Sequence, residues 1–171
     1  HKIDGVSGAN CYLVTSEADM VLIDTGMRGS SEKVERYLMG LGKSSSDIKY
    51  IFITHADLDH AGGAAEMKKM TGAKLVIHAG DAGVLTGTSR GRKLNGLPGI
   101  FLKFIASFIH SQRVEPDIVL KENTEIAGFK IMNTPGHSEG SLSIYLPGKV
   151  IFVGDALRSD AKGNLMLPSK I

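Results

Sequence analysis

The chain has 171 residues, of which 42% are hydrophobic and 22% are charged, and this size and composition predict one globular domain with a substantial core. A net charge of +2 is too weak to indicate nucleic acid as a partner. The single cysteine, Cys11, excludes an internal disulfide framework and a thiolate zinc site, and the apolar residues after it predict a buried strand position.

No segment is apolar over the roughly 18 residues that a transmembrane helix requires, so stable membrane insertion is not expected. No signal peptide is visible, and we therefore expect a cytoplasmic location.

Apolar runs alternate with amphipathic segments in the first half of the chain, which predicts strands and helices in turn. A helix is expected from Ser30 or Ser31 to Gly40 or Gly42, with acidic residues in its first turn. The other expected elements are strands at 10–15, 20–23, 50–53 and 74–78, a helix at 64–70 and a short helix or turn at 81–85.

The pattern becomes irregular at about 86–114, which we treat as an insert within a single domain of residues 1–171. A basic stretch with Arg90, Arg92 and Lys93 precedes the most hydrophobic segment of the chain, 100–109. The basic side chains could meet an anionic group of a substrate or lie on a solvated loop. The apolar segment could pack in the core, line a cleft, touch a membrane surface or join a homo-oligomer.

After Pro116 the sequence becomes a series of short apolar runs separated by glycine and proline. These runs predict strands at 117–120, 124–126, 129–133, 141–146 and 149–153. The whole chain therefore predicts a mixed α/β fold in which helices cover sheet.

Metal-binding residue types are concentrated directly after the strand expected at 50–53, in the segment His55-Ala56-Asp57-Leu58-Asp59-His60. Imidazole nitrogen and carboxylate oxygen are ligands that suit Zn, Fe or Mn. In an extended turn, His55, Asp57 and Asp59 would point one way and His60 another, so that the turn could supply two metals. The alternative is an Asp-rich helix cap with incidental histidines.

Two further loops carry ligand-type residues. His137 lies at the tip of a tight turn, Thr134-Pro135-Gly136-His137-Ser138, between two expected strands. Asp155 follows the strand expected at 149–153, and Asp24 follows the one at 20–23 in the same way. A carboxylate just past a buried strand is well placed to bind a ligand at the edge of a sheet.

The order of these motifs resembles the metallo-β-lactamase superfamily of hydrolases. The resemblance includes Leu22-Ile23-Asp24-Thr25-Gly26, the His55–His60 segment followed by Ala61-Gly62-Gly63, the His137 turn and Gly154-Asp155-Ala156. It implies an αββα four-layer sandwich, two facing sheets with helices outside, and an active site on loops at one edge.

The resemblance also implies a role for each ligand-type residue at a centre of two divalent metal ions. His55, Asp57 and His137 would hold the first metal, Asp59 and His60 the second, Asp155 would bridge both, and Asp24 would orient the site.

The chain departs from the usual family pattern at two points. Asp57 stands where most members have histidine, and a carboxylate there shifts the expected metal from Zn, the first choice, toward Fe or Mn. No histidine follows His137, although members usually supply a last histidine ligand beyond the Asp155 position. We therefore expect a C-terminally incomplete fold, a ligand from a partner, or a defective second site.

The implied activity is that of a metal-dependent hydrolase, in which a metal-bound hydroxide attacks an ester, thioester, lactone or related bond of a small molecule. Asp59 would be the catalytic carboxylate that orients this hydroxide. The turn around His137 is similar to the glyoxalase II branch, which favours thioesters or related esters. The alternatives are a diiron redox domain of the flavodiiron type, suggested by Asp57, and a non-catalytic or incomplete domain.

Overall fold

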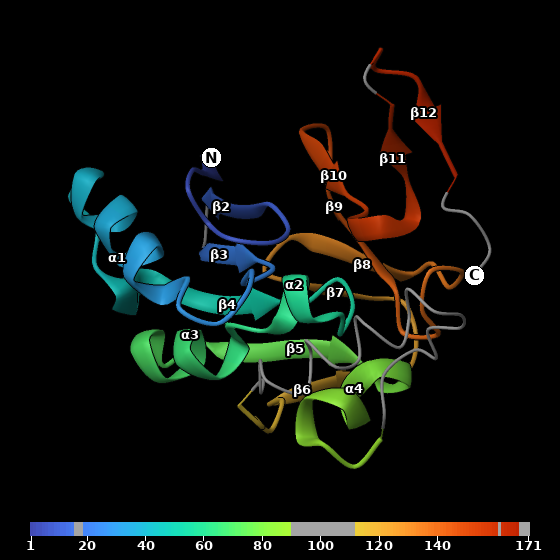
Figure 1. The fold of residues 1–171 in the computed structure, drawn as a ribbon, viewed down its shortest axis with the longest axis horizontal. Coiled ribbons are helices and arrows are strands. Elements are labelled where there is room, and N and C mark those ends of the chain that lie inside the picture. The colour runs from blue at the N-terminus through green and yellow to red at the C-terminus, as the bar shows by residue number, and fades with distance from the viewer. Residues whose placement is uncertain (16–18, 90–111, 161, 168–171) are drawn as a thin grey trace, which may run out of the picture.

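The computed structural model describes residues 1–15, 19–89, 112–160 and 162–167, which form two main β-sheets with helices against one of them (Figure 1). The first sheet has six strands in the order β1-β2-β3-β4-β5-β6. Strands β1 to β3 pair antiparallel, and β3 to β6 pair parallel. Their bounds are β1 Lys2–Ile3, β2 Cys11–Thr15, β3 Met20–Ile23, β4 Ile48–Phe52, β5 Lys74–His78 and β6 Ile118–Leu120.

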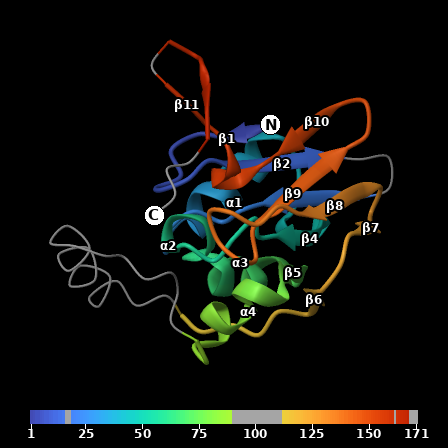
Figure 2. The ribbon, with the colours of Figure 1, turned by 90° about the vertical axis from the view of Figure 1, so that its right-hand side faces the viewer.

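The second sheet has four antiparallel strands in the order β10-β9-β8-β7. These are β7 Thr124–Ile126, β8 Phe129–Asn133, β9 Leu142–Leu146 and β10 Val150–Phe152. A separate hairpin of β11 (Arg158–Ser159) and β12 (Leu165–Met166) extends away from both sheets (Figures 1 and 2).

The α-helices of the described residues all pack on the same face of the six-stranded sheet. They are α1 Ser31–Gly40, α2 Leu58–Ala61, α3 Ala64–Thr71 and α4 Ala79–Thr86. Each contributes to one apolar cluster, in which Val34, Leu38, Met67 and Leu85 meet alternate residues of the strands such as Leu22 and Ile51. The helices therefore form a layer because each has one apolar face to bury.

The opposite face of the six-stranded sheet packs on the four-stranded sheet. Val21, Phe52 and Val76 from the first sheet meet Phe129 and Ile144 from the second in another buried cluster. Strand β3 is apolar and buried along its whole length because both of its faces are covered, and β4 ends in the buried pair Ile51 and Phe52 for the same reason. The view in Figure 2 shows the four-stranded sheet on the side of the molecule away from the helices.

The predicted α/β class with two facing sheets is confirmed, and the observed strands and helices match most of the expected bounds. The fourth layer of the expected sandwich has no helix among the described residues, because α1 to α4 all lie on the other side. Strands β1, β11 and β12 and the short helix α2 were not predicted. Most of the insert, including Arg90, Arg92, Lys93 and the apolar segment 100–109, lies outside the described residues.

Two shorter features complete the described chain. The 3₁₀ turns η1 (Ser45–Asp47) and η2 (Gly154–Ala156) precede β4 and follow β10. A search of the described helices for one that is long and apolar enough to cross a bilayer finds none.

Candidate metal centre

The candidate site lies where the carboxyl ends of the parallel strands meet the loops of the second sheet. Asp24 follows β3, and Thr54 and His55 follow β4, its parallel neighbour. The loop between β8 and β9 carries His137. Where this loop ends, the N–H of Leu142, the first residue of β9, donates a hydrogen bond to the Thr54 carbonyl at 2.8 Å, which holds the loop beside the end of β4. Parallel pairing places these strand ends at one edge, which is the usual location of ligand sites in such sheets.

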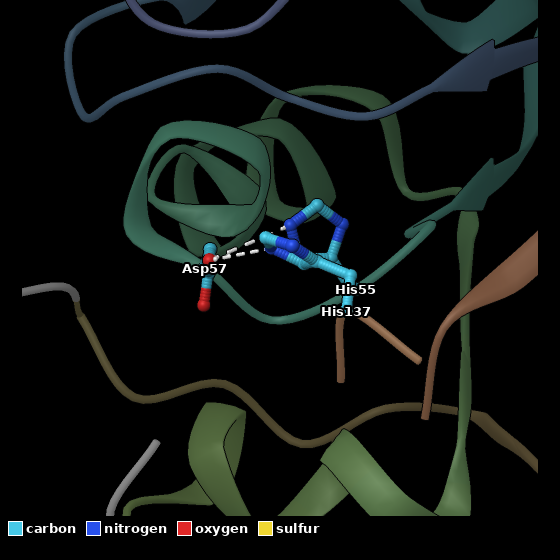
Figure 3. Close-up of side chains that lie close together, drawn as sticks. All are labelled: His55, Asp57 and His137. Atoms are coloured by element: carbon cyan, nitrogen blue, oxygen red, sulfur yellow. Dashed lines mark hydrogen bonds and ion pairs between the residues drawn. The ribbon is translucent and has the colours of Figure 1, made fainter. Parts of the chain in front are cut away.

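Three predicted residues come together in a first ligand group, defined as His55, Asp57 and His137, whose ligand atoms all lie within 4.8 Å of one another. The Oδ2 atom of Asp57 lies 3.0 Å from His137 Nε2 and 3.7 Å from His55 Nε2 (Figure 3). Both histidines are buried, while the Asp57 side chain is partly exposed.

A second ligand group is formed by His55, His60 and Asp155, again with ligand atoms within 4.8 Å of one another. His60 Nε2 lies 3.3 Å from Asp155 Oδ1, and the rings of His55 and His60 have centroids 4.0 Å apart. The other carboxylate oxygen of Asp155 lies 3.7 Å from His137 Nε2. Asp155 therefore faces both groups, as a bridging ligand would.

The side chain of His55 gives the most direct indication that an ion belongs here. Its Nε2 atom is buried and has no hydrogen-bond partner. A buried polar nitrogen without a partner costs about 1–3 kcal/mol. A metal ion bound by the imidazole would compensate for that cost, and the surrounding carboxylates would balance its charge.

Asp24 and Thr54 fix the orientation of two of the histidines. Its carboxylate accepts hydrogen bonds from the Thr54 N–H and the Thr54 hydroxyl, both at 2.8 Å, and its Oδ2 lies 2.8 Å from His60 Nδ1. The Thr54 hydroxyl also lies 3.1 Å from His55 Nδ1. With both Nδ1 atoms occupied by these contacts, the Nε2 atoms are directed toward the site, the arrangement found around histidine metal ligands.

The electrostatics of the site follow from this crowding of acids and imidazoles. Burial alone would lower the pKa of His60, but the hydrogen bond to Asp24 and the charges of Asp24, Asp59 and Asp155 raise it. Burial would raise the pKa of Asp155, but the hydrogen bond from Arg158 and the charges of His60 and His137 lower it. Asp155 is therefore ionised at neutral pH.

The structure corrects the predicted extended turn, which is wrong beyond Asp57. The short helix α2 begins at Leu58 with Asp57 as its N-cap. In a helix, residues three apart share a face, so His60 turns inward beside His55 rather than pointing elsewhere. Asp59 belongs to neither ligand group, and its half-exposed carboxylate lies at the rim, 3.9 Å from His60 Nε2.

Sequence reasoning missed three residues of the site. Thr54 is a small polar residue at the end of an apolar strand, and only its contact with Asp24 and His55 shows its importance. Arg158, which bonds to Asp155, lies past the recognised motif. Asp81 resembles an ordinary acid in the first turn of a helix, although its carboxylate faces the loops of the site.

Comparison with known proteins agrees with this geometry. The Metallo-beta-lactamase superfamily pattern matches residues 4–170. The uncharacterized protein YobT of Bacillus subtilis is 29% identical over 87% of this chain and 62% of its own length. The probable metallo-hydrolase YqgX of the same organism is 27% identical over 91% and 72%. A hydroxyacylglutathione hydrolase of Rhodospirillum rubrum is 30% identical over 96% and 54%.

Solved structures show the same fold. A metallo-beta-lactamase of Cronobacter sakazakii superposes with a TM-score of 0.70 at 26% identity, over 89% of this chain and 57% of that one. The native FEZ-1 metallo-beta-lactamase of Legionella gormanii gives a TM-score of 0.63 at 26% identity, over 79% and 50%. The chain thus spans about half the length of these structures. The fold, the order of the ligand-bearing loops and the match over residues 4–170 show that the chain belongs to the metallo-β-lactamase superfamily.

Proposed function

We propose that this chain binds divalent metal ions at the two ligand groups and acts as a hydrolase on an ester, thioester, lactone or related bond of a small molecule. The observation that carries the proposal is the position of His55. Its Nε2 atom is buried without a hydrogen-bond partner and belongs to both groups. Zinc is the metal we place first, because imidazole and carboxylate ligands suit it well.

The residues of the chain would divide the work of such a reaction. Bound divalent ions would supply Lewis acidity and a water molecule of lowered pKa. Asp24 and Thr54 would hold the imidazoles of His55 and His60 in a fixed orientation. The carboxylate of Asp59, half exposed at the rim, would orient the attacking water and accept its proton.

The bond that is cleaved is proposed from the relatives. YqgX is named a probable metallo-hydrolase, and several relatives are named hydroxyacylglutathione hydrolase. These names support hydrolysis of an acyl bond, and we place thioesters first because the turn around His137 resembles the glyoxalase II branch. Since the chain spans 48% to 72% of these relatives, the substrate belongs to the proposal.

A panel assay tests the proposed activity. The chain is loaded with Zn and offered an acyl thioester, an aliphatic lactone and a phosphodiester, with the chelated protein as a blank. We expect thioester or lactone hydrolysis that falls at least about tenfold in Asp59→Asn, because a positioned general base contributes at least that much. Metal-loaded protein without activity on any acyl substrate would contradict the hydrolase proposal.

Asp57 favours one alternative, an iron-dependent redox domain. Its carboxylate takes part in the first ligand group, and such a ligand shifts preference toward Fe or Mn. This alternative predicts iron in the purified chain and oxygen consumption when a reductant is added. Zinc as the tightly bound metal, with no oxygen consumption by the iron-loaded form, would exclude it.

A further inference from the structure

Asp81 is a buried acid with an unusual set of partners. It lies in the first turn of α4 and is only 5% exposed. Its Oδ2 accepts hydrogen bonds from the Ala56 N–H at 2.9 Å and from the Ser138 hydroxyl at 2.8 Å. Its Oδ1 accepts one from the Gly140 N–H at 3.0 Å. One carboxylate thus holds two chain segments that are about eighty positions apart.

The bonded segments are the ones that carry the first ligand group. Ala56 lies between His55 and Asp57, and Ser138 directly follows His137. The contact between His137 Nε2 and Asp57 Oδ2, at 3.0 Å, bridges the same two segments on the side of the site. Asp81 therefore ties the two loops together through residues that neighbour the ligands in sequence.

The close approach of α4 to the β8–β9 loop depends on two glycines. A Cβ atom added to Gly140 would lie 2.6 Å from the Asp81 Cγ atom, and one added to Gly80 would lie 2.9 Å from the Gly140 nitrogen. Real side chains do not approach so closely, so this junction accepts only glycine at these positions without a shift. The absence of side chains at these two glycines therefore lets the β8–β9 loop contact the Asp81 carboxylate directly.

A helix-capping role does not account for Asp81. The cap of α4 is His78, whose Nδ1 accepts from the Gly80 N–H at 3.2 Å. An acid at this third helical position usually bonds back to the start of its own helix, whereas both oxygens of Asp81 bond to other segments. Burying a carboxylate is costly, and its three donors lie only on the loops of the site.

We infer that Asp81 is a positioning residue that sets the separation of Asp57 and His137, and thereby the metal affinity of the first ligand group. The inference rests on the proposed metal site, and it adds a residue outside the ligand set. Removing the carboxylate would leave Asp57 and His137 attached to loops with one fewer common anchor. Metal affinity would fall because the two ligand side chains would be less ordered before the ion binds.

Metal titration of Asp81→Asn tests the inference. Asparagine has nearly the same shape but only one acceptor oxygen, so it cannot satisfy donors on both sides. We expect metal affinity to fall about 10- to 100-fold, the usual effect of removing a group that supports metal ligands. The absorption spectrum of bound Co²⁺ should also change, because it reports ligand geometry. Ser138→Ala, which removes the hydroxyl that bonds to Asp81 and Ser141 but leaves the two backbone N–H bonds to Asp81, should give a smaller loss in the same direction.

Asp117→Asn is the matched control. Asp117 also accepts a backbone N–H, from Leu75 at 2.8 Å, and pairs with Lys68. It lies at the other end of β5, so its variant should lose stability without any change in metal affinity or Co²⁺ spectrum. A folded Asp81→Asn protein with the affinity and spectrum of the wild type would overturn the inference.

Amide hydrogen exchange separates this inference from the metal proposal. If wild-type protein bound no metal, the proposed function would fail, but exchange in the metal-free protein would still decide the role of Asp81. Ala56 and Gly140 should exchange at least about tenfold faster in Asp81→Asn, since each loses its acceptor. Unchanged exchange at both amides would show that Asp81 does not hold the loops.

Discussion

At the scale of single residues, Thr54 links the acid and the imidazoles of the candidate site. Its hydroxyl donates to Asp24 and lies within reach of the Nδ1 atoms of His55 and His60, at 3.1 and 3.4 Å. Asp24 itself adopts a φ of +56°, a left-handed conformation that aspartate tolerates better than most residues. The backbone after β3 thus places this carboxylate against Thr54, just past the end of β4.

His137→Ala tests whether the first ligand group holds an ion. The imidazole lies beside Asp57 and Asp155, so its removal should eliminate most binding at that group. Competition with a chromophoric chelator measures the change. The matched control is His78→Asn, which keeps a good helix cap outside the ligand groups and should bind metal as the wild type does. Equal metal binding by His137→Ala and wild type would show that the three loops do not form one site.

Cys11 gives a prediction about the core at the same scale. Its side chain is fully buried, and burial together with the charge of Asp24 raises the pKa of its thiol far above the ordinary range. The folded protein should therefore not react with a thiol reagent at pH 8, whereas the unfolded protein should react with one equivalent. Rapid reaction without unfolding would contradict the buried position.

The same shift predicts a dependence of stability on pH. In the unfolded state the thiol ionises at about pH 8.5, whereas in the folded state it stays protonated. Above that pH the unfolded state therefore binds fewer protons than the folded state. The free energy of unfolding should therefore fall as pH rises from 8 to 10. This fall should be smaller in Cys11→Ala, when both proteins are compared by denaturant titration.

At the scale of elements, the site is assembled at strand ends, and η2 is one of its close junctions. Gly154, with a φ of +51°, precedes Asp155 at the end of β10. A Cβ atom there would lie 2.7 Å from the Thr54 hydroxyl oxygen. The strand end that brings Asp155 to the site is thus packed directly on the end of β4.

Gly154→Ala is expected to disturb the second ligand group. The left-handed backbone alone costs about 1–2 kcal/mol for a residue with a side chain, and the clash would also move Thr54 or Asp155. We expect metal affinity to fall at least about tenfold, measured by titration calorimetry. Gly148→Ala is the control, because Gly148 has a φ of +70° with open space around it. Gly148→Ala should lose a similar amount of stability from backbone strain but bind metal as the wild type does. Equal losses of metal affinity in the two variants would contradict the idea that the clash at η2 disturbs the site.

The sequence predicted most elements because their apolar periodicity decides them. Strand 20–23 and the centre of strand 74–78, Leu75 to Ile77, are buried on both faces and form continuous apolar runs, and both strands were found at the expected residues. The four-residue helix α2 has no such period, so its sequence looked like an extended turn. Because the helix replaces the expected extended turn, His60 points into the site and Asp59 lies at its rim, the opposite of what was expected. The candidate ligands themselves were recognised.

The other omissions have the same physical origin. The importance of Asp81 depends on the Ala56 and Gly140 amides, which become its partners only when β5, β4 and the β8–β9 loop meet in the fold. A short sequence window contains no trace of such contacts. Motif reasoning finds residues whose chemistry is unusual, whereas residues that position them are recognised only from the assembled structure.

At the scale of the whole molecule, the six-stranded sheet separates two apolar cores, one against the helices and one against the second sheet. Phe129 lies in the core between the sheets, fully buried, with its ring centroid 5.7 Å from that of Phe52. This core holds the loop bearing His137 over the ends of β3 and β4, so the site depends on the packing of the two sheets.

Phe129→Ala should destabilise the whole fold by about 3–5 kcal/mol, the usual cost of a large cavity in a core. Denaturant unfolding provides the measurement. Ile151→Ala is the comparison, because Ile151 is 49% exposed on β10 and should cost less than about 1 kcal/mol. Similar losses for the two variants would contradict the assignment of the buried core between the sheets.

Metal content is the measurement that tests the central claim most directly. Wild type, His55→Ala and His78→Asn are purified without chelator or affinity metal, supplied with excess Zn, desalted and analysed by elemental mass spectrometry. Because His55 belongs to both ligand groups, we predict at least one tightly bound ion in wild type and His78→Asn, and essentially none in His55→Ala. No bound metal in wild type, or the same content in His55→Ala, would contradict a metal centre at this site.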